Sequence, residues 1–206
     1  EAFLDPTVKR LMPDPNTLTA MQDAAARIAH AVVRGEKVAI FGDYDVDGAT
    51  ASALLARFLR SAGLDPLVYI PDRIFEGYGP NIEAIRMLAA KGATLLVTVD
   101  CGTVSHEPFA EAQRLGVDVI AIDHHQADEV LPATLALVNP NRQDDLSQLG
   151  HLAAVGLSFM TTVAVNRELR QRGFWSNGRS EPDLLGMLDF VALGTVADVV
   201  PLKGLN

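Results

Sequence analysis

The chain has 206 residues, of which 49% are hydrophobic and 21% are charged, and its formal net charge is -9. This balance is typical of a globular domain with a hydrophobic core, and it excludes a disordered chain. The negative charge argues against a protein that coats nucleic acid through bulk positive charge, but metal ions bound at an enzyme site would reverse the sign locally. A single cysteine, Cys101, excludes an internal disulfide and favours a cytoplasmic protein, and no run of about 18 apolar residues predicts a membrane span.

The predicted elements alternate between helix and strand along most of the chain. Residues 1–15 hold three prolines and are predicted to be an extended surface segment. Hydrophobic periodicity then predicts helices over 16–33, 49–59, 81–91, 107–115, 152–169 and 183–200, the last with a bend at Gly194, and strands over 38–42, 67–70, 94–99, 117–122 and 135–138.

Strands about 25 residues apart with helices between them indicate βαβ units. We therefore expect an α/β fold, with a doubly wound, mainly parallel five-stranded sheet flanked by helices and a helical C-terminal part over 151–206. The whole chain, 1–206, is predicted to be a single domain. Because it lacks an initiator methionine, we expect it to be a fragment of a longer protein.

Acidic and imidazole side chains follow the ends of several predicted strands. Three aspartates come after the first strand, Asp100 after the third, and an Asp-His-His run after the fourth, while a last acid follows Gly194; the full set is Asp43, Asp45, Asp47, Asp100, Asp123, His124, His125 and Asp198. The carboxyl ends of parallel strands share one edge of a sheet, where such folds bind ligands. Carboxylates this close stay ionised only beside a cation or strong donors, so we predict a hard-metal site.

The first acidic run also resembles a calcium loop, and its twelfth position tests that possibility. An EF-hand requires glutamate there, and this chain has Leu54, with a strand rather than a helix before the loop. The mixture of imidazole and carboxylate favours manganese, iron or zinc over calcium.

Two further stretches suggest contacts with a phosphate. The loop over 71–80 has two glycines around Tyr78, and Arg73 could bind a phosphate through two hydrogen bonds, although a plain structural turn explains the loop equally well. At the start of the helix from 152, small residues could leave backbone N–H groups open to a phosphate or could serve close packing.

The ordered motifs together resemble those of the DHH phosphoesterase superfamily. They are Asp43-Tyr-Asp45-Val-Asp47-Gly48, Asp100-Cys-Gly102, Asp123-His124-His125 and Gly194-Thr-Val-Ala-Asp198. The sequences Glu76-Gly-Tyr-Gly79, Val138-Asn-Pro140 and Leu193–Leu202 add a likeness to the bacterial members that degrade single-stranded DNA from the 5′ end in recombination and repair. The resemblance implies two Mn²⁺ or Mg²⁺ ions in the site and single-stranded DNA as substrate.

The resemblance also implies a role for each matching residue. One metal would be held by Asp47, Asp100, His124 and Asp198, and the second by Asp45 and Asp100 with Asp43 nearby. Asp43 would substitute for a histidine that other branches carry where this chain has Phe41. Asp100, Asp123 and His125 would form the catalytic set, with His125 facing the scissile phosphate and Asp123 orienting the histidines. Arg73, Tyr78, His125 and Asn139 would contact the substrate.

The chain departs from the family pattern in two ways. A Gly-x-Gly sequence is usual near the start of the helix at 152, where this chain has Ala154-Val155-Gly156, and the DHH-associated and oligonucleotide-binding domains of the longer family members have no counterpart here. We expect a monomer, with any single-strand-binding protein or helicase contacting regions outside this chain. The alternatives are another DHH activity, on pyrophosphate, short oligoribonucleotides or cyclic dinucleotides, or a scaffold without catalysis.

Overall fold

The computed structural model describes residues 7–176 and 178–206, so the first six residues of the predicted extended segment lie outside it. A helix separates each pair of consecutive strands from β1 to β4, and β5 follows β4 without a helix between them. The strands are β1 Val38–Gly42, β2 Leu67–Tyr69, β3 Leu95–Val99, β4 Asp118–Ile122 and β5 Ala136–Val138. The α-helices are α1 Val8–Leu11, α2 Met21–Arg34, α3 Val46–Ser61, α4 Ile82–Ala90, α5 His106–Arg114, α6 Ala154–Gln171 and α7 Leu188–Ala197. Short 3-10 helices cover Pro15–Thr17, Phe174–Ser176 and Leu185–Met187.

All five strands are parallel and lie in the order β2-β1-β3-β4-β5, which confirms the predicted sheet. From β1 the chain crosses to β2 on one side, and from β2 it returns past β1 to β3 on the other. This order places the reversal of winding between β1 and β3, where open α/β sheets bind their ligands at the carboxyl ends of the strands. The loops after these two strands carry Asp43 and Asp100.

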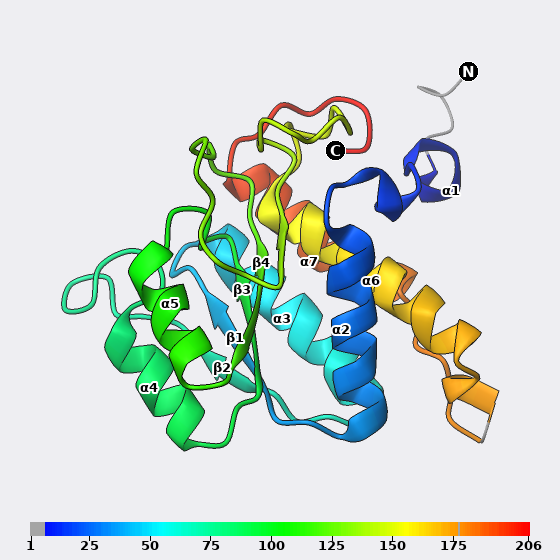
Figure 1. The fold of residues 1–206 in the computed structure, drawn as a ribbon. Helices are drawn as coiled ribbons and strands as arrows, with labels where there is room; N and C mark the ends of the chain where they lie inside the picture. Colours follow the sequence, from blue (N-terminus) through cyan, green and yellow to red (C-terminus); the bar gives the residue numbers. More distant parts are fainter. Residues whose placement is uncertain (1–6, 177) are drawn as a thin grey trace.

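Helices cover both faces of the sheet (Figure 1). Ile40 and Val97 point into the larger core, which is closed by α2, α3 and α6, whereas Ala39 and Phe41 point into the smaller core beneath α4 and α5. Strands β1 and β3 are buried along their whole length, as expected for central strands of a doubly wound sheet.

Several helix boundaries differ from the sequence prediction for local reasons. The Asp14 side chain accepts a hydrogen bond from the N–H of Asn16 and starts a 3-10 turn, so α2 begins only at Met21. Helix α3 begins earlier than expected, because Asp45 is its N-cap and accepts from the N–H of Gly48 at 2.9 Å. Helix α7 continues through Gly194 and ends at Ala197. A short helix, α1, also lies within the segment predicted to be extended.

Among the residues described, no helix combines the length and the apolar character needed to cross a lipid bilayer.

Candidate metal centre

The loop between β1 and α3 holds its three aspartates in different environments. Asp43 is buried, Asp45 is exposed at the helix N-cap, and Asp47 is buried in the first turn of α3. Glycine is required at position 48, because a Cβ there would lie 2.6–2.8 Å from backbone atoms of Asp43. The Asp-x-Asp-x-Asp-Gly sequence therefore folds the chain back on itself and points its carboxylates toward the end of the sheet.

The N-terminus of α6 holds Asp47 in place. The backbone N–H groups of Ala154 and Val155 donate to its two carboxylate oxygens, at 2.6 and 2.8 Å. The sequence left open whether these amides face a phosphate or serve close packing of the helix, and in the structure they bind the Asp47 carboxylate instead. The helix dipole and the two hydrogen bonds stabilise a buried anion that lies 107 residues away in the chain.

Asp100 lies directly after β3 in a left-handed conformation, with φ of 61°. Its N–H donates to the carbonyl of Ile122 at 3.0 Å, which anchors this unusual backbone to the end of β4. Apart from glycine, asparagine and aspartate are the residues that adopt such angles most readily, so an aspartate suits this position. The side chain of Asp100 is turned into the centre of the acidic cluster, where it is 1% exposed.

The Asp-His-His segment after β4 is ordered by its own aspartate. One Asp123 oxygen, Oδ1, accepts from the N–H groups of His124 and His125 and lies 2.7 Å from His125 Nδ1, and the other accepts from the N–H of Thr103. Burial alone would raise the pKa of Asp123, but the hydrogen bonds from His125 and Thr103 outweigh it and lower the pKa to about 2. The hydrogen bond to Asp123 raises the pKa of His125.

Two asparagines hold the backbone of both histidines. Asn139 Nδ2 donates to the carbonyl of His125 at 2.9 Å, and Asn141 Nδ2 donates to the carbonyl of His124. Asn139 is fully buried, and it also bonds to Thr103 and to the N–H of Asn141. This placement favours a positioning role for Asn139 over the substrate contact suggested by the sequence. No sequence pattern predicted Thr103, and for Asn141 the Asn-Pro-Asn sequence after β5 is the one local signal.

His124 brings three acids together. Its Nε2 atom lies 3.2 Å from Asp100 Oδ1, 3.7 Å from Asp198 Oδ2 and 3.8 Å from Asp47 Oδ2. Asp198 reaches this point as the C-cap of α7, and α7 can approach because residue 194 is glycine: a Cβ there would lie 3.0 Å from Asp47 Oδ1. The four side chains proposed for one metal are thus adjacent.

A second group of acids shares Asp100 with the first. Three sets of side chains each place their ligand atoms within 4.8 Å of one another. The sets are Asp43, Asp45 and Asp100; Asp47, His124 and Asp198; and Asp100, His124 and His125. Burial, with a smaller contribution from Asp198, raises the pKa of Asp47 to about 6. Burial together with Asp47 and Asp45 raises the pKa of Asp100 to about 10. The buried Oδ1 atoms of Asp43 and Asp100 accept no hydrogen bond. Mutually repelling carboxylates with open lone pairs fit divalent cations.

Two predicted substrate residues border this cluster on the loop between β2 and α4. The Tyr78 hydroxyl donates to the carbonyl of Asp100 at 3.1 Å and lies 3.2 Å from His125 Nδ1. Burial is the main cause that raises the pKa of Tyr78 far above its ordinary value, so it stays a hydrogen-bond donor. The guanidinium of Arg73 lies over the ring of Tyr44, with Cζ 5.2 Å from the centroid.

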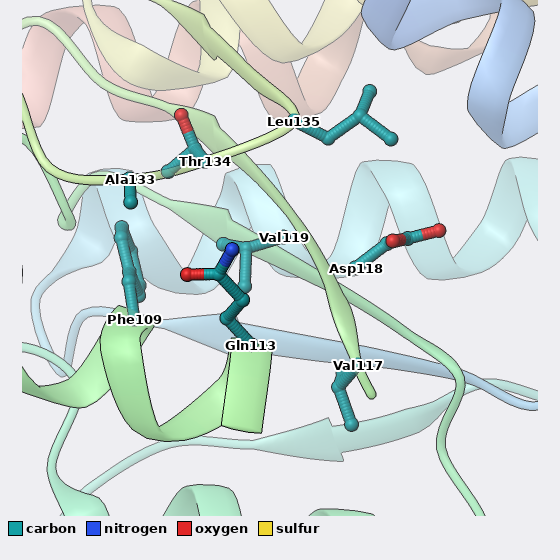
Figure 2. A pocket seen from close by; sticks show the side chains of 8 residues that line it. All are labelled: Phe109, Gln113, Val117, Asp118, Val119, Ala133, Thr134 and Leu135. Atoms are coloured by element: carbon teal, nitrogen blue, oxygen red, sulfur yellow. The ribbon is translucent and has the colours of Figure 1, made fainter. Parts of the chain in front are cut away.

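A separate surface pocket of about 320 Å³ lies between α5 and the segment that leads into β5 (Figure 2). Its lining includes Phe109, Gln113, Asp118 and Thr134. Asp118 begins β4, and the Asp-His-His segment follows the other end of the same strand. The pocket therefore lies away from the acidic cluster.

Comparison with known proteins fits this geometry. Residues 37–195 match the DHH family, N-terminal domain, and this range includes all the acidic and histidine residues of the cluster except Asp198. The chain belongs to the DHH family. The single-stranded-DNA-specific exonuclease RecJ of Dickeya dadantii is 42% identical over 195 residues, which are 94% of this chain and 34% of the relative; RecJ of Escherichia coli is 40% identical over 206 residues, 98% and 35% of the two chains.

Solved structures show the same fold for this DHH domain. An exonuclease RecJ crystallised with manganese superposes with a TM-score of 0.79 at 35% identity, over 95% of this chain and 46% of the other. RecJ from Thermus thermophilus in complex with Mn²⁺ gives 0.76 at 32% identity, over 98% and 27%. The chain spans about a third of the length of the curated relatives it matches.

Proposed function

We propose that this chain is the catalytic core of a metal-dependent exonuclease that hydrolyses phosphodiester bonds of single-stranded DNA from the 5′ end. The decisive observation is two neighbouring ligand groups, one of Asp47, His124 and Asp198 and the other of Asp43, Asp45 and Asp100. Asp100 joins them, because its Oδ1 atom lies 3.2 Å from His124 Nε2. The resemblance of its sequence and fold to RecJ proteins, including two crystallised with manganese, supports this assignment.

One Mn²⁺ or Mg²⁺ ion would be held by Asp47, Asp100, His124 and Asp198. A second ion would be held by Asp45 and Asp100, with Asp43 nearby. When bound, such a pair activates a water molecule and stabilises the charge on the attacking and leaving oxygens of an in-line displacement. Asp47 is suited to this role because the amides of α6 fix its carboxylate, so little side-chain freedom is lost on metal binding.

The remaining residues of the site would orient the phosphate. His125 is half exposed, and its bond to Asp123 fixes the ring and favours the charged form, which donates a hydrogen bond to an anionic oxygen. The Tyr78 hydroxyl contacts both the His125 ring and the backbone carbonyl of Asp100, and so holds these two residues relative to each other. Arg73, exposed beside Tyr44, would bind a neighbouring phosphate. Asn139 and Asn141 would act as positioning residues through the carbonyls of the two histidines.

The test measures Mn²⁺-dependent release of nucleotides from a labelled single-stranded DNA oligonucleotide, with the wild type and Asp100→Asn side by side. We expect turnover only in the wild type, with single-stranded DNA preferred over a duplex of the same sequence. Pyrophosphate and cyclic dinucleotides serve as competing substrates, and hydrolysis of one of them without hydrolysis of DNA would assign the chain to another DHH activity. Absence of stoichiometric Mn²⁺ binding by calorimetry would instead indicate a scaffold.

A further inference from the structure

The loop between β2 and α4 carries two exposed apolar side chains at the edge of the metal centre. Ile74 is 84% exposed and Phe75 is 86% exposed. Within residues 7–176 and 178–206, Phe75 is the phenylalanine, tyrosine or tryptophan with the greatest exposure, and Tyr78, which is 48% exposed, belongs to the same loop. Single exposed apolar residues are common on protein surfaces, but two adjacent ones beside the metal centre form a contiguous patch that a ligand of the site could contact.

The backbone beneath these two side chains is held by a closed set of hydrogen bonds. One Asp72 oxygen accepts from the N–H groups of Ile74 and Phe75, at 2.8 and 3.1 Å. Glu76 accepts from the N–H of Asp72 at 2.7 Å and from the hydroxyl of Tyr69, and its own N–H donates back to Asp72. The turn therefore presents Ile74 and Phe75 outward from a fixed backbone.

Both ends of this segment are attached to the acidic cluster. On one side Arg73 packs over Tyr44, which stands between Asp43 and Asp45, and on the other Tyr78 contacts Asp100 and His125. A polymer with one phosphate at the cluster would therefore pass beside the loop. A nucleobase close to that phosphate is the group that would reach Phe75.

We propose that Phe75, supported by Ile74, is a stacking platform for an unpaired nucleobase of the strand being hydrolysed, which rests on the proposed function of the site. Stacking on an aromatic ring tolerates every base, as an enzyme that removes successive nucleotides requires. It also contributes binding without positive charge, which suits a chain of net charge -9. Bases of a duplex are already stacked on their neighbours, so the platform favours single strands.

The test compares the wild type with Phe75→Ala and Phe75→Trp, with Val33→Ala as the matched control. Val33 is a half-exposed apolar residue in the last turn of α2, at the opposite end of the sheet from the acidic cluster. Each protein receives a single-stranded oligonucleotide and the same oligonucleotide with abasic sites at its first three 5′ positions. Binding is measured by fluorescence anisotropy in EDTA, and turnover is measured with Mn²⁺.

We expect Phe75→Ala to weaken binding and to raise KM about 5- to 20-fold, the lower part of the range for stacking on one side chain, with kcat little changed. Abasic sites should weaken the wild type by a similar factor and Phe75→Ala no further, because both changes remove the same contact. Phe75→Trp should bind as well as the wild type, and its added indole should lose fluorescence when the strand binds.

Equal weakening of the wild type and Phe75→Ala by abasic sites would overturn the proposal. So would unchanged DNA binding by Phe75→Ala together with a loss of self-association in sizing experiments, because Phe75 would then contact a second copy of the chain. Base-dependent binding through Phe75 without metal-dependent hydrolysis would keep the platform and refute the proposed nuclease, so the two failures are distinguishable.

Discussion

Replacing Asp100 by asparagine should stabilise the metal-free protein while removing its response to Mn²⁺. Asparagine has nearly the same shape, and it is one of the few residues that tolerate the left-handed backbone at this position, whereas alanine would add backbone strain. The substitution therefore removes the ionisable group, which the metal-free fold keeps protonated at pH 7, and leaves the loop geometry intact. It isolates the electrostatic cost of the site.

The size of the effect follows from the raised pKa. An ordinary aspartate has a pKa of 3.8, and burial with Asp47 and Asp45 raises that of Asp100 to about 10. Each pH unit between 3.8 and 7 costs about 1.36 kcal/mol, so folding with this group present costs up to about 4 kcal/mol at pH 7. The buried amide is not fully hydrogen-bonded, which offsets part of the gain. We expect the free energy of unfolding in EDTA to rise by about 1–3 kcal/mol.

Urea unfolding at pH 7, in EDTA and with Mn²⁺, measures both effects. The wild type should gain stability from Mn²⁺ and Asp100→Asn should gain little. Asp123→Asn is the matched control: hydrogen bonds outweigh burial and lower the pKa of Asp123 to about 2, so this variant should lose about 2 kcal/mol. If Asp100→Asn proves less stable than the wild type in EDTA, the carboxylate stabilises the empty fold and the reasoning fails.

The same geometry leads to three further predictions. In EDTA the free energy of unfolding should fall as the pH rises above about 4, because the fold raises the pKa values of Asp47 and Asp100 above 3.8 and both groups resist losing their protons. Urea titrations from pH 4 to 8 check this expectation. A free energy of unfolding that does not change over this range would contradict it. Gly194→Ala should destabilise the protein by about 1–3 kcal/mol and weaken Mn²⁺ binding, because its Cβ would lie 2.4 Å from Thr50 Oγ1 and 3.0 Å from Asp47 Oδ1. Gly156→Ala is the control: its Cβ would make only ordinary contact with Leu152, at 3.7 Å, so it should stabilise the protein by about 0.5–1 kcal/mol in the same unfolding assay. Asn141→Ala should weaken Mn²⁺ binding about 10- to 100-fold by calorimetry, because the carbonyl of His124 loses its donor; unchanged affinity would remove Asn141 from the positioning set.

The sequence alone determined the sheet and the edge at which the site is built. Apolar runs that end in acids can be identified locally, because strands and helices have different periods, and parallel strands bring their carboxyl ends together wherever they occur. Asp43, Asp100 and His124 could therefore be assigned to one site from the strands that they follow. The motif order then indicated the family.

Tertiary structure decided how that site is held. The bonds from α6 to Asp47 and from Asn141 to His124 join segments far apart in the chain, and no periodic pattern marks them. The left-handed backbone of Asp100 is likewise fixed by a bond to Ile122 on the next strand. Sequence patterns report which face of an element is apolar, whereas the partner of a buried polar atom depends on where distant elements pack, so only the fold could decide it.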